Sequence, residues 1–137
     1  TVDAGNFSGW PQRFLSFGGF GMTGQELATA VQYGAAPLIL VFNNAMYGTI
    51  RMHQERRHPG RVIGTDFVNP DFAAMARSFG AYGETVTRTE EFVPAFKRAA
   101  ACGKAAVIEL KTNPDTITNR TTLTAVREAA RQGENHA

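Results

Sequence analysis

The sequence has little cysteine and no long hydrophobic run. Its one cysteine, Cys102, excludes an intramolecular disulfide framework and a cysteine-rich zinc site. This usage fits a reducing compartment, so we expect a cytoplasmic protein. The longest apolar stretch, residues 35–42, is far shorter than the roughly 20 residues that a membrane span needs, and we recognise no signal-peptide pattern. We therefore expect no membrane partner.

An excess of one charge is also lacking. Fourteen Lys and Arg residues stand against 12 Asp and Glu residues, and the net charge of +2 gives no reason to expect a nucleic-acid partner. Hydrophobic residues make up 43% of the 137, which excludes a disordered chain and suits a single domain. Because the chain starts at Thr1 without a methionine, we interpret it as a fragment of a larger protein.

Helical patterns alternate with apolar runs of strand length. We expect helices over residues 22–33, 70–79, 90–102 and 123–132, and strands over 37–42, 83–88 and 104–112. The runs PLILVF and KAAVIELKT are continuous rather than alternating, which is typical of strands that are buried on both faces. The pattern predicts an α/β fold with three layers, α/β/α, around a mostly parallel sheet.

Local signals give the expected ends of these helices. Thr23 is a candidate N-cap with Glu26 three residues later, and Asn69 followed by Pro70 is a strong helix start. Pro94 should lie in the first turn of its helix. The run RMHQERRHPGR, residues 51–61, is interpreted as a solvated or subunit-facing loop, and its two histidines have no metal partners at ligand spacing.

Two segments should lie where open parallel sheets bind ligands, beyond the carboxyl ends of the strands. The first, SFGGFGMTG, is glycine-rich and precedes a helix, where free backbone N–H groups can bind an anion such as phosphate. The second is the pair Asn43-Asn44 after the apolar strand. An amide oxygen at such a place is a suitable Mg²⁺ ligand, but asparagine is equally a turn residue, and both readings stay open.

Longer stretches resemble a known family. GMTGQELATAVQYGAAPLILVFNNAMYGTIR is similar to the thiamine-diphosphate-dependent enzymes of the acetolactate synthase, pyruvate decarboxylase and benzoylformate decarboxylase type, in their C-terminal cofactor-binding domain. The similarity continues through HQERRHPGRVIGTDFVNPDFAAMARSFGA to about Lys111, and DAGNFSGW resembles the opening of the same domain. The resemblance implies that residues 1–137 are a single diphosphate-binding domain.

The family's signature is Gly-Asp-Gly, followed at the end of the next strand by Asn-Asn. Its Asp, its second Asn and a main-chain carbonyl two residues later bind Mg²⁺, which implies Asn44 and the carbonyl of Met46 as metal ligands here. Gly18 matches the second glycine of the signature. Phe17 occupies the Asp position, 27 residues before Asn44, and a phenyl ring cannot coordinate a cation.

Other positions carry over to the diphosphate of the cofactor. The resemblance implies cofactor-binding roles for Gly5, Asn6, Phe7, Gly18, Gly19, Asn44, Met46 and Tyr47. In the family a longer stretch separates DAGNFSGW from the signature, whereas only residues 11–17 do so here. We therefore expect a missing segment near the junction of Phe17 and Gly18, either deleted or skipped by the numbering.

The implied parent is a 2-oxo acid decarboxylase or carboligase that uses thiamine diphosphate and Mg²⁺. Its implied partners are the pyrimidine-binding domain of the same enzyme, on the same or a partner chain, further copies in a homo-oligomer, and a small 2-oxo acid substrate. No catalytic residue is assigned to this chain. Two alternatives remain, a non-catalytic binding or assembly module of the same ancestry and a dinucleotide-binding domain. The latter is raised by the G-x-G-x-x-G spacing of Gly19, Gly21 and Gly24.

Overall fold

The structure is a computed structural model that describes residues 20–21 and 23–134. These residues form two compact units. Unit 1 comprises the described residues up to Asn43 together with Asn69–Thr112, and unit 2 comprises Asn44–Val68 and the described residues from Asn113 onward. None of the described helices is long and apolar enough to cross a membrane.

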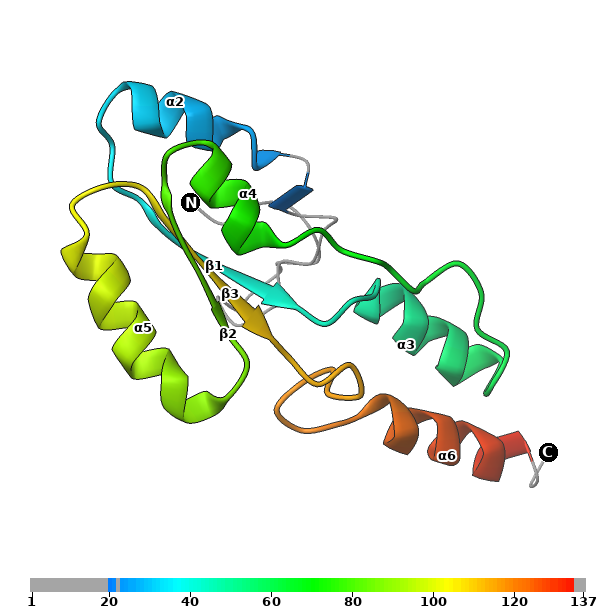
Figure 1. Cartoon of the computed structure of the whole chain (residues 1–137). Coiled ribbons are helices and arrows are strands. Elements are labelled where there is room, and N and C mark those ends of the chain that lie inside the picture. The colour runs from blue at the N-terminus through cyan, green and yellow to red at the C-terminus, as the bar shows by residue number, and fades with distance from the viewer. Residues whose placement is uncertain (1–19, 22, 135–137) are drawn as a thin grey trace. The chain divides into compact units, whose positions relative to one another are not determined.

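The described part of unit 1 is built on a parallel sheet whose strand order is β1-β3-β2 (Figure 1). Its strands are β1 (Leu38–Asn43), β2 (Tyr82–Val86) and β3 (Ala106–Lys111). The first residues of β1 and β2 both pair with Ala106, so the three strands begin in register and end at the same edge. The central strand β3 is buried over its first four residues, of which the first three are apolar.

Helices cover both faces of this sheet (Figure 1). On one face lie α2 (Glu26–Gln32) and α4 (Phe72–Ser78), and on the other lies α5 (Thr89–Ala101). The buried core of the first face comprises Phe20, Leu27, Val41, Phe72, Ala76, Ala81, Ala105 and Val107. That of the second face comprises Val86, Ala95, Ala99, Ala106 and Ile108. The expected three-layer α/β fold with a parallel sheet is confirmed.

Gly83 allows α4 to lie close to β2. A Cβ atom built at this glycine would stand 2.1 Å from the carbonyl oxygen of Ala73 and 2.9 Å from its carbonyl carbon. Both atoms belong to helix backbone, which cannot move aside as a flexible side chain would. The sequence therefore needs a residue without a Cβ where the strand passes under the helix.

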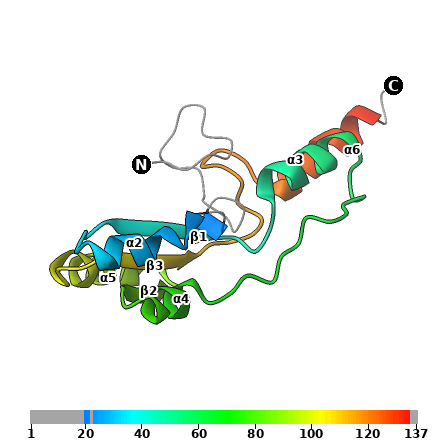
Figure 2. The same cartoon turned by 90° about the horizontal axis from the view of Figure 1, so that it is seen from above.

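Unit 2 contains the helices α3 (Gly48–Arg57) and α6 (Leu123–Glu134), which run side by side (Figures 1 and 2). Glu55 of α3 is fully buried and pairs with Arg127 of α6 through two hydrogen bonds, one of 2.9 Å to Arg127 Nε and one to Nη2. Asp115 accepts a hydrogen bond of 2.9 Å from Thr124 N at the start of α6. The pair of Glu55 and Arg127 thus joins the two helices, and Asp115 binds the first turn of α6.

Three local expectations are wrong. Residues 51–57 belong to α3 rather than to a loop, because the buried residue of that helix is the charged Glu55, which leaves no apolar stripe to recognise. The N-caps are Gln25 and Asp71 instead of Thr23 and Asn69, and Asp71 Oδ1 accepts from Ala74 N at 2.8 Å. Pro94 lies inside α5, beyond its first turn.

Candidate functional site

The end of β1 carries the Asn43-Asn44 pair. Both residues are buried, with exposed fractions of 5% and 6%. The backbone leaves the strand by a tight turn in which Ala45 has a left-handed φ of 56°. Asn44 Oδ1 accepts a hydrogen bond of 3.3 Å from Met46 N, so the side chain of Asn44 forms the Asx turn that its residue type favours. The side chain of Asn44 is therefore both buried and engaged in a local hydrogen bond.

The carbonyl of Met46 is oriented by a short antiparallel bridge between Met46 and Asp66. The bridge is closed by Phe67 N donating to Ala45 O at 2.8 Å and Tyr47 N donating to Thr65 O at 2.9 Å. Neither bond uses the carbonyl oxygen of Met46, and no other backbone N–H of the described residues donates to it. The carbonyl oxygen of Met46, two residues after Asn44, thus has lone pairs that no backbone hydrogen bond of the described residues uses.

The oxygen atoms of Asn44 and Met46 fit part of a magnesium site. Mg²⁺ takes oxygen ligands, and it keeps several positions for water and substrate phosphates. Asn44 Oδ1 has one long hydrogen bond and a second lone pair, and Gly48 leaves room beside the amide nitrogen of the same side chain, since a Cβ there would stand 3.0 Å from Asn44 Nδ2. Both candidate ligand groups are neutral, and the described residues contain no group of three or more His, Cys, Asp or Glu side chains arranged for a metal.

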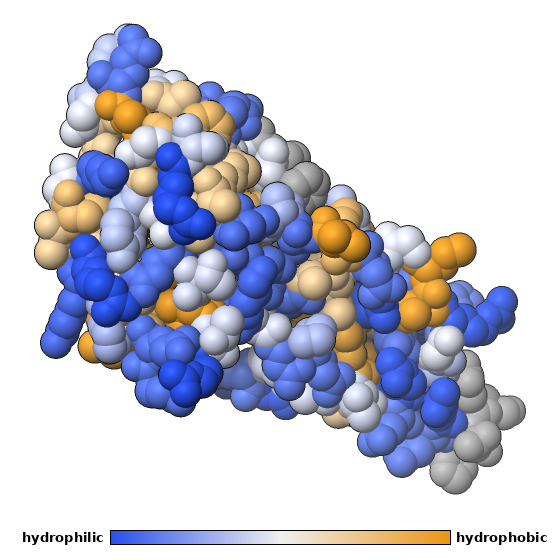
Figure 3. Space-filling view, in the orientation of Figure 1, coloured by the Kyte–Doolittle hydropathy of each residue, from blue (hydrophilic) through white to orange (hydrophobic). Residues whose placement is uncertain are grey.

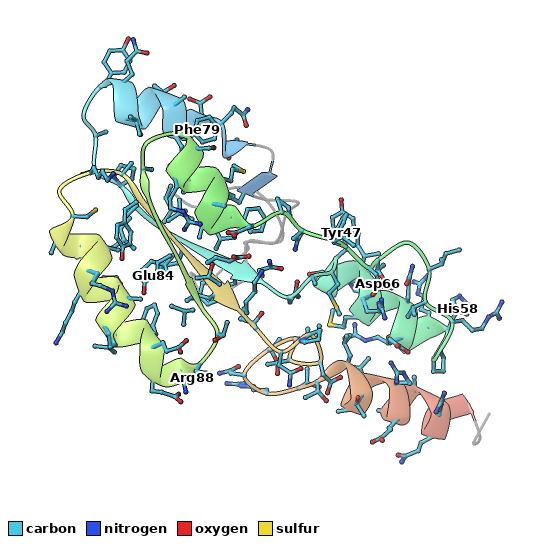
Figure 4. All side chains as sticks on the ribbon, in the orientation of Figure 1. Tyr47, His58, Asp66, Phe79, Glu84 and Arg88 are labelled. Carbon is cyan, nitrogen blue, oxygen red and sulfur yellow. The ribbon has the colours of Figure 1, made fainter. Side chains whose placement is uncertain are left out.

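Tyr47 follows these two oxygens and is the N-cap residue of α3 (Figure 4). It is half-buried, and its ring packs edge-on against Phe67 with centroids 4.0 Å apart. No side chain caps the N-terminus of α3. The first turn of a ten-residue helix therefore offers backbone N–H groups and the positive end of the helix dipole beside Asn44 and Met46 in the chain.

Several predicted positions cannot be placed. Gly5, Asn6, Phe7, Gly18 and Gly19 lie outside the described residues, as does the junction of Phe17 and Gly18. The structure therefore brings together Asn44, Met46 and Tyr47 alone from the predicted set. His53 and His58 are exposed on and just after α3.

A buried carboxylate at the carboxyl end of the sheet in unit 1 was not predicted from the sequence. Glu109 of β3 is 1% exposed and accepts hydrogen bonds from Asn43 Nδ2 at 2.6 Å, Lys111 Nζ at 2.6 Å and Thr85 Oγ1 at 3.1 Å. A lone acidic residue inside the apolar run KAAVIELKT was the available signal. A charge in a strand that is buried on both faces needs partners of its own.

A second buried carboxylate, Glu55, lies in unit 2. Hydrogen bonds from Arg127 lower its pKa below the ordinary value of 4.5, burial opposes this shift, and the N–H of Gly60, which donates at 2.8 Å, lowers the pKa further. The same ion pair raises the pKa of Arg127. Glu55 is thus held ionised by a partner on another helix, and its geometry is that of a structural ion pair.

Comparisons with known proteins agree on one family. The family model described as "Thiamine pyrophosphate enzyme, C-terminal TPP binding domain" matches residues 18–110. The protein YdaP of Bacillus subtilis, whose name describes it as containing thiamine pyrophosphate, is 37% identical over 93 residues, which are 68% of this chain and 16% of YdaP. An acetolactate synthase large subunit of Parasynechococcus marenigrum is 40% identical over 68 residues, 48% of this chain and 11% of that protein.

A solved structure gives the same result. A thiamine diphosphate-dependent 4-hydroxybenzoylformate decarboxylase of Rhodococcus jostii superposes with a TM-score of 0.66 at 31% sequence identity. The match covers 73% of this chain and 19% of the decarboxylase. The chain thus spans less than a fifth of the length of the relatives that it matches here.

Proposed function

Because the chain belongs to the thiamine pyrophosphate enzymes, as their C-terminal TPP binding domain, we propose that it binds thiamine diphosphate together with Mg²⁺. The parent activity we propose is decarboxylation of a 2-oxo acid, with or without carboligation. Relatives named acetolactate synthase and a neighbour named as a decarboxylase support this reaction class. The observation that carries the metal part is the turn after β1, which presents Asn44 Oδ1 and leaves the carbonyl of Met46 unused.

Each residue of this turn has a separate task in the proposal. Asn44 and the Met46 carbonyl supply two oxygen ligands, and the diphosphate supplies the negative charge that these neutral ligands lack. No side chain caps the N-terminus of α3, whose N-cap residue is Tyr47. The positive end of the helix dipole can therefore stabilise the negative charge of the diphosphate. Gly5, Asn6, Phe7, Gly18 and Gly19 complete the proposed binding set. When bound, thiamine diphosphate supplies the electron sink for cleavage next to the keto group.

The proposal also includes partners. The domain belongs to multi-domain enzymes, and we propose that a pyrimidine-binding domain, on the same or a second copy of the chain, covers part of unit 2 in a cytoplasmic homo-oligomer. Three large apolar side chains of that unit are exposed, with fractions of 51% for Ile50, 80% for Ile63 and 102% for Val68. Figure 3 shows hydrophobic side chains reaching the surface among hydrophilic ones. Sedimentation of the chain over a range of concentrations should show self-association, whereas a monomer at every concentration contradicts this part.

One observation favours a second candidate, a non-catalytic module of the same ancestry. Phe17 stands at the position of the family's metal-binding Asp. If Phe17 and Gly18 are joined with nothing between them, the metal site has no carboxylate ligand. Sequencing the encoding gene across this junction decides between a skipped segment and a direct bond.

A thermal-shift measurement tests the proposed binding. A ligand at 100 times its Kd stabilises the folded state by about 2.7 kcal/mol, which raises Tm by several degrees in a chain of this size. We expect such a rise with thiamine diphosphate plus Mg²⁺, a smaller one after chelation of the metal, and none with NAD. A rise with NAD alone favours the dinucleotide-binding reading, and no rise with any ligand contradicts the proposed function.

A further inference from the structure

Hydrogen bonds link three side chains across the carboxyl end of the sheet in unit 1. Glu109 in β3 accepts from Asn43 at the end of β1, and Asn43 Oδ1 in turn accepts from Asn69 Nδ2 at 2.6 Å. Asn43 and Glu109 are at least 95% buried. Asn69, which is 26 positions after Asn43, and Glu109, which is 66 positions after it, are thereby joined to Asn43 in one row.

The charge at Glu109 sets the direction of every bond in this row. An ionised carboxylate has no proton to donate, so Asn43 must turn its Nδ2 group toward Glu109. Asn43 Oδ1 then points to Asn69, which must present Nδ2. Asn69 Oδ1 is left buried with no partner among the described residues. One charge thus determines which end of each amide faces its neighbour.

The backbone of Asn43 is held as firmly as its side chain. Its carbonyl oxygen accepts from Thr112 N at 3.0 Å, directly after the last residue of β3. Asn44, the proposed metal ligand, is the next residue in the chain. Fixing Asn43 therefore also fixes the peptide bond between Asn43 and Asn44, which directly precedes the turn that Asn44 forms with Met46.

We propose that Glu109 is a positioning residue that orients the amides of Asn43 and Asn69 and fixes the residue from which Asn44 leaves the strand. The part concerning Asn44 rests on the proposed function. Glu109 acts through Asn43 and touches no cofactor. A purely structural role, in which Glu109 forms an ion pair with Lys111 at 2.6 Å, predicts that stability alone depends on it.

Two variants at position 109 separate these roles. Glu109→Met keeps the length of the side chain but removes the acceptor, so Asn43 and Asn69 are no longer oriented. Glu109→Gln keeps one side-chain oxygen, which Lys111 and Asn43 should orient toward themselves by donating hydrogen bonds to it. This variant should therefore preserve the row. We expect affinity for thiamine diphosphate with Mg²⁺ to fall on the order of tenfold in Glu109→Met and to stay near wild type in Glu109→Gln.

Lys111→Met is the matched control, because it removes the ion pair and leaves the bond between Asn43 and Glu109 intact. The side-chain amide NMR signals of Asn69 provide a second readout, since Asn69 does not touch Glu109. They should move in Glu109→Met and stay in place in Lys111→Met. Asn43→Ala removes the middle of the row and should reproduce both effects of Glu109→Met, so the test does not depend on one variant folding.

The outcomes are distinguishable. Unchanged Asn69 signals in both Glu109→Met and Asn43→Ala overturn the proposal, and so does an equal loss of affinity in Lys111→Met. If the wild-type chain binds no thiamine diphosphate, the proposed function fails, and the Asn69 signals alone then decide whether Glu109 orients the amides. Shifted signals together with a selective loss of affinity support the whole proposal.

Discussion

The buried pair of Glu55 and Arg127 should respond unequally to removal of its two members. The side chain of Glu55 has no exposed surface, whereas that of Arg127 is 32% exposed. Arg127→Ala leaves a buried carboxylate to which, among the described residues, only the N–H of Gly60 still donates, at 2.8 Å. Removing one partner of a buried pair costs about 3–5 kcal/mol. We expect about 3 kcal/mol here, because the space left by Arg127 admits water.

Glu55→Gln should cost less, although it also removes the ion pair. The neutral amide still accepts hydrogen bonds, and the partly exposed guanidinium of Arg127 remains hydrated. We expect a loss of about 1 kcal/mol, the usual worth of a weakened hydrogen bond. Arg131→Ala is the control on the same helix. Arg131 is exposed, and its removal should change stability by less than about 0.5 kcal/mol.

The stability of the wild type and that of the two variants should depend differently on pH. In the wild type the folded-state pKa of Glu55 lies below its unfolded value, so its stabilising contribution is present above about pH 4.5 and is lost as pH falls through the folded pKa. Without Arg127, burial dominates and should raise the folded pKa above the ordinary value. Acidification from pH 7 toward pH 4.5 should then shrink the deficit of Arg127→Ala, while Glu55→Gln has no such titration.

Urea denaturation followed by circular dichroism at pH 7 and pH 4.5 measures both quantities. An unequal role of the two members is refuted if Glu55→Gln costs as much as Arg127→Ala at pH 7. It is refuted equally if the deficit of Arg127→Ala is the same at both pH values, because a buried and uncompensated carboxylate must then be absent.

Three further predictions concern backbone and capping. Gly83→Ala should destabilise the fold by several kcal/mol or prevent folding, since its Cβ would stand 2.1 Å from Ala73 O, and soluble yield with urea denaturation checks this. Gly133→Ala, in α6 with no atom within 4 Å of the added Cβ, should instead be neutral or stabilising by up to about 0.5 kcal/mol in the same assay. Asp71→Ala removes the N-cap bond to Ala74 N and should lower the free energy of unfolding by about 1 kcal/mol, whereas Asp71→Asn should retain most of it.

The fold could be predicted wherever burial leaves a pattern in the sequence. The strand over 37–42 was recognised because its side chains pack alternately against the two cores, Ile39 and Val41 against one and Leu38 and Leu40 against the other, so that successive residues are all apolar. Helix α3 was missed because Ile50 is 51% exposed and the fully buried Glu55 is charged, so its hydrophobic spacing is not helical. In that helix the buried face is defined by a partner 72 residues away.

Long-range contacts also decided the helix start near residue 70. Asn69 and Asp71 are both good N-cap residues beside a proline, and the local sequence cannot choose between them. Asn69 Nδ2 donates to Asn43, and Asn69 Oδ1 accepts from no group among the described residues, whereas Asp71 Oδ1 accepts from Ala74 N and caps the helix.

At the candidate site, the sequence pointed to Asn44 and Met46 but not to the row through Glu109. Asn44 and Met46 were identified through the resemblance to the family, whose Asn-Asn signature and following carbonyl lie in one short segment of the chain. The row depends on which strands are neighbours, and this is decided by the pairing of β1 with β3. The turn role of Asn44 is now observed, and a ligand role is compatible with it because the amide oxygen has a second lone pair.

The most direct test of the central claim is a titration of thiamine diphosphate into the wild type and Asn44→Ala at several Mg²⁺ concentrations. If Asn44 Oδ1 is a metal ligand, the variant should bind the cofactor more weakly, and excess Mg²⁺ should recover part of the affinity by mass action. If Asn44 serves only the turn with Met46, the variant loses stability, and whatever affinity it retains does not depend on added Mg²⁺ more than that of the wild type. Equal affinities at every Mg²⁺ concentration would contradict the account.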